Sequence, residues 1–115
     1  MPNRRKKKDF NPNNCGVTHF LNQIGGSWKI LILYGISRKC NRFSLLRKAI
    51  PQISKQMLVN QMRELQEDQI IERIDYAETP PKVEYILSEY GKSLMPIIGV
   101  IEQWGQKELR KKSGL

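Results

Sequence analysis

Apolar residues between positions 43 and 68 recur at helical spacing in two short runs. The first run ends at Pro51, because proline lacks an amide donor and disfavours a helical residue before it. Ser54 precedes the second run, where its side chain can accept a hydrogen bond from an unpaired amide. The apolar stripes are Phe43, Leu46 and Ile50 in the first run, and Leu58, Met62 and Leu65 in the second. Two helices joined by a short turn are predicted, which is the form of a helix-turn-helix.

A predicted β-hairpin follows these two helices. Residues 71–77 and 83–87 are rich in β-branched and aromatic side chains. Residues 78–82, Glu-Thr-Pro-Pro-Lys, cannot continue a strand and form the turn between them. A hairpin directly after a helix-turn-helix is a wing, so the pattern indicates a winged helix-turn-helix. In such modules the second helix enters the major groove, and the wing lies along the backbone or the minor groove.

Helices are also predicted on both sides of this unit. A short helix starts near Cys15 and ends at Gly25-Gly26, and a second apolar helix follows it. Ser88 can cap a last helical segment, which Pro96 should kink or split. The expected fold is α+β, mainly α: a basic disordered tail over residues 1–14 and one winged helix-turn-helix domain over residues 15–112, with a two-stranded wing and terminal dimerisation helices.

The apolar stripes of the terminal helices have two interpretations: packing on the domain's own core, or a dimer surface. We favour the dimer, because small DNA-binding domains often need two copies to recognise two half-sites. The predicted dimer residues are Val17, Phe20, Leu21, Leu94, Ile97, Ile98, Ile101 and Trp104.

The composition favours a polyanionic partner. Twenty Lys and Arg against eleven Asp and Glu give a formal charge of +9 and a pI near 9.8, and double-stranded DNA is the expected partner. The basic run at residues 4–8 is either a solubilising tail or an arm that adds phosphate contacts. No apolar run approaches the roughly 20 residues of a membrane span, and no signal core follows the N-terminus, so a cytoplasmic protein is expected.

The outer face of the second helix of the motif carries the side chains suited to base readout. Gln and Asn can bond adenine, and Arg can bond guanine, each in a bidentate manner. The predicted base-reading residues are Lys55, Gln56, Asn60 and Arg63. Residues that flank the motif or lie on the wing are candidates for phosphate contacts: Arg42, Arg47, Ser54, Arg73 and Lys82. The plainer alternative is a solvated helix face, which most surface helices have.

Several motifs in a fixed order resemble the HxlR-type winged helix-turn-helix regulators of bacteria. They are Cys15, Ile24-Gly25-Gly26-Ser27-Trp28-Lys29, Arg42-Phe43-Ser44 with Leu46-Arg47, Ile53-Ser54, Met57-Leu58, Leu65-Gln66-Glu67-Asp68, Pro80-Pro81-Lys82-Val83-Glu84-Tyr85 and Leu87-Ser88-Glu89-Tyr90-Gly91. One departure is Gln69, where the family commonly has Gly. The resemblance implies a homodimeric DNA-binding transcriptional regulator. It also implies that the cysteine matched by Cys15 senses oxidants or electrophiles in some members.

An alternative function and the role of Cys15 stay open, whereas an enzyme is disfavoured. The basic charge would also serve a winged-helix module that binds RNA or a protein. Cys15 is either a thiol sensor or an inert, partly packed thiol, and sequence cannot separate the two. An enzyme is not expected, because His19, the only histidine, has no partner carboxylate or nucleophile nearby in sequence. No cysteine spacing matches a zinc site, so neither a metal nor a cofactor is expected.

Overall fold

A computed structural model describes residues 10–113. The elements in chain order are a 3-10 turn η1 (Pro12–Asn14), α2 (Gly16–Ile24), α3 (Lys29–Ser37), α4 (Phe43–Ala49), α5 (Lys55–Glu67), β1 (Ile71–Asp75), β2 (Val83–Leu87), α6 (Glu89–Lys92) and α7 (Met95–Ser113). The strands form one antiparallel pair in which Arg73 lies opposite Tyr85. The fold is therefore mainly helical with a two-stranded wing, and the predicted fold class is confirmed.

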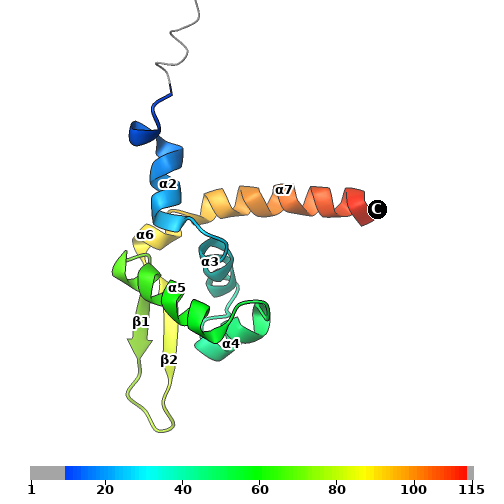
Figure 1. Cartoon of the computed structure of the whole chain (residues 1–115). Coiled ribbons are helices and arrows are strands. Elements are labelled where there is room, and N and C mark those ends of the chain that lie inside the picture. The colour runs from blue at the N-terminus through cyan, green and yellow to red at the C-terminus, as the bar shows by residue number, and fades with distance from the viewer. Residues whose placement is uncertain (1–9, 114–115) are drawn as a thin grey trace, which may run out of the picture.

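The helix-turn-helix forms where the sequence predicts it. α4 ends at Ala49, just before Ile50 and Pro51, and α5 begins after Ser54. The Ser54 side chain accepts a hydrogen bond from the Met57 amide at 3.0 Å, which satisfies one unpaired donor of the first turn. In Figure 1 α4 and α5 lie side by side, and the wing extends away from the helices.

A single apolar cluster fills the centre of the domain. α3, α4 and α5 contribute most of it, because each presents apolar side chains inward, and the end of α2, the start of β1 and one residue of α7 complete it. Its buried members are Ile24, Ile32, Leu33, Ile36, Leu46, Ile50, Ile53, Leu58, Met62, Leu65, Ile70, Ile71 and Ile98. This cluster holds the helix-turn-helix and the base of the wing in one rigid arrangement.

The connection from α5 to the wing is tight. Gln69 adopts a positive φ of 60°, the left-handed conformation that glycine prefers, so the departure from the family pattern is accommodated by a turn and not by a longer helix. Ser88 then caps α6, accepting from the Gly91 amide at 3.0 Å, while its hydroxyl lies 2.7 Å from the Gln69 carbonyl oxygen. A Cβ atom at Gly91 would collide with the Ile70 carbonyl, so α6 can approach β1 only through glycine.

The last helical segment is split into α6 and α7 just before Pro96, as the sequence predicts. Three other expectations need adjustment. The first strand ends at Asp75, short of the predicted residue 77, because the Asp75 carboxylate accepts from the Ala77 amide and Ala77 turns to φ 53°. Residues 10–14, expected in a disordered tail, include the turn η1, while residues 1–9 of that tail lie outside the described residues. Ile98 is wrong as a dimer residue: it is 2% exposed, inside the core of the single chain.

The terminal helices project from the domain. Figure 1 shows α2 rising from one end and α7 running outward as a long arm. Both helices carry exposed large apolar side chains: Val17 and Leu21 on α2, and Ile97, Val100, Ile101, Trp104 and Leu109 on α7. Phe20 and Leu94, also predicted for the dimer, are half-buried and pack against the core of their own chain.

Candidate nucleic-acid interface

Three of the four predicted base-reading residues form one row on α5. The Gln56 side-chain amide donates to the Asn60 carbonyl oxygen at 3.0 Å, and the Arg63 guanidinium lies 3.3 Å from the same oxygen. Arg63 also lies 3.9 Å from the Glu67 carboxylate. Among the described residues, the Gln56 carbonyl oxygen and the Asn60 amide group have no side-chain hydrogen bond. An adenine edge pairs with one acceptor and one donor, which these two neighbouring side chains would supply together.

The opposite face of α5 fixes how this row is presented. Leu58, Met62 and Leu65 are buried in the core, which sets the rotation of the helix about its axis. The Lys29 ammonium of α3 lies 2.7 Å from a Glu64 carboxylate oxygen, and Lys29 is only 7% exposed. The hydrogen bond from Lys29, followed by its positive charge, lowers the pKa of Glu64. The outer face of α5 is therefore held against a rigid support.

α5 also exposes two apolar side chains beside the polar row. Met57 is 38% exposed and Val59 37% exposed. Apolar side chains in the major groove can contact the methyl group of thymine. Neither residue is among the predicted base-reading residues. The available signal was an apolar residue outside the Leu58, Met62 and Leu65 stripe.

A shallow basic hollow, which we call the α4–α5 hollow, lies between α4 and the start of α5. It is lined by Phe43, Ser44, Arg47, Lys48, Pro51 and Lys55. It joins one predicted phosphate residue, Arg47, to one predicted base reader, Lys55. Ser44 and Lys48 were not predicted, because only the folded turn brings α4 and α5 together.

The wing carries the other predicted phosphate residues, Arg73 and Lys82. The Arg73 guanidinium lies 4.0 Å from the Asp75 carboxylate. The Lys82 ammonium lies over the Tyr76 ring, 4.5 Å from its centre, and the Tyr76 hydroxyl donates to Glu84 at 2.8 Å. That hydrogen bond is the main reason why the pKa of Tyr76 is raised. Arg73 thus lies close to a carboxylate, and Lys82 lies over a ring whose hydroxyl is bonded to one.

The base of the wing is joined to the helix-turn-helix through the segment before α4. The Tyr85 amide donates to the Asn41 carbonyl oxygen at 2.9 Å. Arg42, the next residue, is exposed at the N-cap position of α4. The structure therefore places this predicted phosphate residue at the junction of the helices and the wing. Ser54, by contrast, uses its oxygen to cap α5 and keeps only its hydroxyl proton for a further partner.

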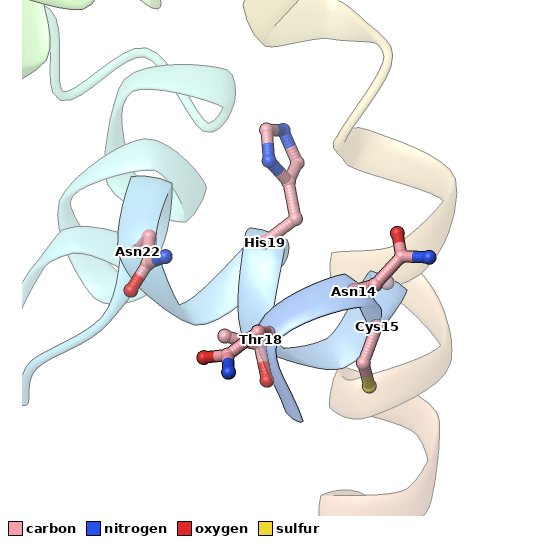
Figure 2. A pocket seen from close by; sticks show the side chains of 7 residues that line it. Asn14, Cys15, Thr18, His19 and Asn22 are labelled. Atoms are coloured by element: carbon pink, nitrogen blue, oxygen red, sulfur yellow. The ribbon is translucent and has the colours of Figure 1, made fainter. Parts of the chain in front are cut away.

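Cys15 lies at the start of α2, apart from the α5 row. It is partly exposed, and the backbone amide of Thr18, then that of Val17, lowers the pKa of the Cys15 thiol. Asn13, Asn14, Thr18, His19 and Asn22 line the open hollow around it. In Figure 2 the His19 ring and the Cys15 sulfur point in opposite directions, so His19 is not placed to accept the thiol proton. Cys40 is a half-buried free thiol after α3.

Comparison with known proteins identifies the family. The model of the HxlR-like helix-turn-helix family matches residues 23–113. The chain belongs to the HxlR-like helix-turn-helix family. It is 41% identical to the uncharacterized HTH-type transcriptional regulator YdeP of Bacillus subtilis, over 93% of this chain and 86% of the relative. It is 43% identical to YtcD of the same organism, over 88% and 80% of the two chains. The predicted family is confirmed.

A solved structure supports the same assignment. The redox regulator HypR in its oxidized form superposes with a TM-score of 0.76 at 40% identity, over 81% of this chain and 96% of that chain. The HxlR-like chain is thus a transcriptional regulator with a helix-turn-helix, and its relatives indicate no enzymatic family.

Within residues 10–113, no group of three or more His, Cys, Asp or Glu side chains is placed to hold a metal ion. None of the helices described there is long and apolar enough to cross a membrane.

Proposed function

We propose that this chain regulates transcription as a homodimer that binds a pseudo-palindromic operator in double-stranded DNA. The observation that carries the proposal is the polar row of Gln56, Asn60 and Arg63 on the outer face of α5, held against a rigid core. A capped, exposed helix with paired amide groups suits the major groove. Lys55, the fourth predicted base contact, lies at the start of the same helix but borders the α4–α5 hollow beside Arg47 and Lys48.

Phosphate contacts would set the position of the helix on the duplex. The proposed contacts are Arg42, Arg47, Ser54, Arg73 and Lys82, which lie on or beside α4, α5 and the wing. Contacts of this kind add affinity without sequence information, because every base pair carries the same backbone. The affinity should therefore fall steeply with salt for every sequence.

The homodimer would be built from the projecting helices. Ile101 and Trp104 of α7 are 45% and 67% exposed, and Leu21 of α2 is 55% exposed. Large apolar side chains exposed on projecting helices mark an association site. Ile101→Glu should convert the dimer to a monomer in sedimentation equilibrium, while Lys112→Glu on the same helix should not. A wild-type chain that sediments as a monomer would contradict the dimer.

Cys15 is the proposed thiol sensor for an oxidant or electrophile. Its lowered pKa raises the fraction of the reactive thiolate, and HypR, to which the chain is similar, is a redox regulator. Diamide should change the operator affinity of the wild type, and Cys15→Ser should abolish that change. Cys40→Ser is the matched control and should respond as the wild type does. A response that persists in Cys15→Ser excludes Cys15 as the sensor.

The deciding experiment is selection of bound sequences from a random pool of duplex DNA at near-physiological salt. An enriched inverted repeat is expected, with half-sites about one helical turn or a multiple apart. Failure to enrich any sequence would count against sequence-specific recognition. Preferential binding of a matched RNA pool would favour an RNA-binding winged helix instead.

A further inference from the structure

Unlike the wing, the α4–α5 hollow has no acidic neighbour among the described residues. Residues 10–63 contain eight Lys and Arg and no Asp or Glu, so no carboxylate from this part of the sequence can neutralise the hollow. Within residues 10–113, Arg47, Lys48 and Lys55 lie in no ion pair of 4 Å or less. Three cations thus surround one hollow without a protein anion.

The wing has the opposite balance. Residues 71–87 hold four carboxylates, at Glu72, Asp75, Glu78 and Glu84, against two cations. Both cations are already engaged, Arg73 beside Asp75 and Lys82 over the ring of Tyr76. An approaching phosphate would have to displace or tolerate these acidic side chains. The wing therefore offers a poorer phosphate site than its two cations suggest.

From these observations we infer that the α4–α5 hollow binds a backbone phosphate of the duplex and contributes more of the non-specific affinity for DNA than the wing does. Arg47, Lys48 and Lys55 supply the charge, and the Ser44 hydroxyl is a further donor on the wall of the hollow. Lys55 is accordingly a phosphate contact and not a base contact. The inference rests on the proposed DNA binding and assigns phosphate contacts to the hollow and base contacts to the polar row of α5.

The geometry is consistent with a phosphate and not with an apolar occupant. Phe43 and Pro51 form part of the wall, but every other lining residue carries a hydroxyl or a positive charge. The hollow adjoins the N-terminal turn of α5, the end of a recognition helix that approaches the duplex in helix-turn-helix proteins. A phosphate in the hollow would thus fix α5 beside the bases that its polar row reads.

The test measures binding of the full chain to a selected duplex and to a scrambled duplex at several salt concentrations. The variants are Lys48→Gln and Lys55→Gln, and Lys112→Gln at the end of α7 is the control that removes the same charge from a distant, exposed site. Each hollow variant should reduce the slope of log affinity against log salt by up to about 0.9 for each bound protomer. The ratio of affinities for the two duplexes should stay unchanged, because phosphates carry no sequence information.

The outcomes separate the inference from the proposed function. A wild type that binds no duplex overturns both. A wild type that binds, with hollow variants whose slopes equal that of Lys112→Gln, overturns only the hollow. A changed sequence preference in Lys55→Gln would return that residue to base readout and overturn its assignment here. Lys48→Arg keeps the charge and should keep the wild-type slope.

Discussion

The first half of the domain, residues 10–63, and the second half, residues 64–113, share one core but differ in charge. The first half has eight cations and no carboxylate, whereas the second half has ten carboxylates and seven cations. In the second half, Arg73, Lys92 and Lys111 each lie within 4 Å of an acidic side chain of the same half. Similar numbers of Lys and Arg can therefore present very different fields to a polyanion, depending on where the acidic residues lie.

This difference changes how the net charge of +9 is interpreted. The total predicts affinity for a polyanion but does not say which surface supplies it. The carboxylate-free half contains α4 and most of α5, which are the elements that approach the duplex in a helix-turn-helix. We therefore expect the first half to supply most of the phosphate contacts with the duplex and the wing to supply fewer.

The largest expected effect comes from reversing charge in the hollow. The double variant Arg47→Glu with Lys48→Glu removes two charged contacts from each protomer, each worth about 1.5 to 3 kcal/mol. Affinity for a selected duplex should fall about 10² to 10⁴-fold for each bound protomer at fixed salt. The matched variant on the wing, Arg73→Glu with Lys82→Glu, changes the net charge equally and should lose less. Equal losses in a fluorescence binding assay would contradict the division between the two halves.

The polar row of α5 should determine which DNA sequence is preferred, whereas the hollow should determine the affinity for any duplex. Gln56→Ala removes the amide that pairs with Asn60 and its proposed base contact. The cost on the preferred duplex should be about 1 to 3 kcal/mol, with little change on a scrambled duplex. Repeating the pool selection with the variant measures this. If its enriched motif matched that of the wild type at every position, Gln56 would not read a base.

Much of the fold follows from local sequence rules. Pro51 and Ser54 mark the turn of the helix-turn-helix, and the Thr79-Pro80-Pro81 turn marks the wing. The row on α5 also follows, because residues three and four apart share a helix face. Ile98 could not be separated from its exposed neighbours on α7, since apolar spacing does not show which part of a stripe its own core covers.

The α4–α5 hollow and the Lys29–Glu64 ion pair could not be predicted from the sequence. Lys48 and Lys55 line the same hollow only once the turn between α4 and α5 has folded. Their spacing along the chain does not predict this proximity. The Lys29–Glu64 pair joins α3 to α5 across 35 positions. Long-range side-chain contacts of this kind have no local periodicity.

The Lys29–Glu64 pair links the two halves and should make stability depend on pH. Glu64 has a lower pKa in the folded chain than in the unfolded chain, so its contribution is present above the unfolded pKa. That contribution is lost as the pH falls through the folded pKa. Glu64→Gln should lower the melting temperature at pH 7, because Lys29 stays buried without its anion. The difference from the wild type should narrow on acidification below about pH 4.

Glu67→Gln provides the matched control for this titration. Glu67 lies on the same helix, is exposed, and approaches Arg63 only to 3.9 Å. Its melting temperature should follow the wild type across the whole pH range, because exposed pairs contribute little. A gap between Glu64→Gln and the wild type that stays constant with pH would show that the effect does not come from ionisation of Glu64.

The smallest expected effect is a gain of affinity on the wing. Asp75→Asn removes the carboxylate beside Arg73 but keeps the side-chain oxygen that accepts from the Ala77 amide, so the end of β1 should be preserved. Freeing Arg73 should strengthen binding to every duplex and steepen the salt slope by up to about 0.9 for each bound protomer. Glu108→Gln on α7 breaks a comparable surface pair with Lys111 and changes the charge equally. If both variants gained the same affinity, net charge alone would explain the gain; a larger gain in Asp75→Asn means that wing acids restrain a cation that otherwise reaches the backbone.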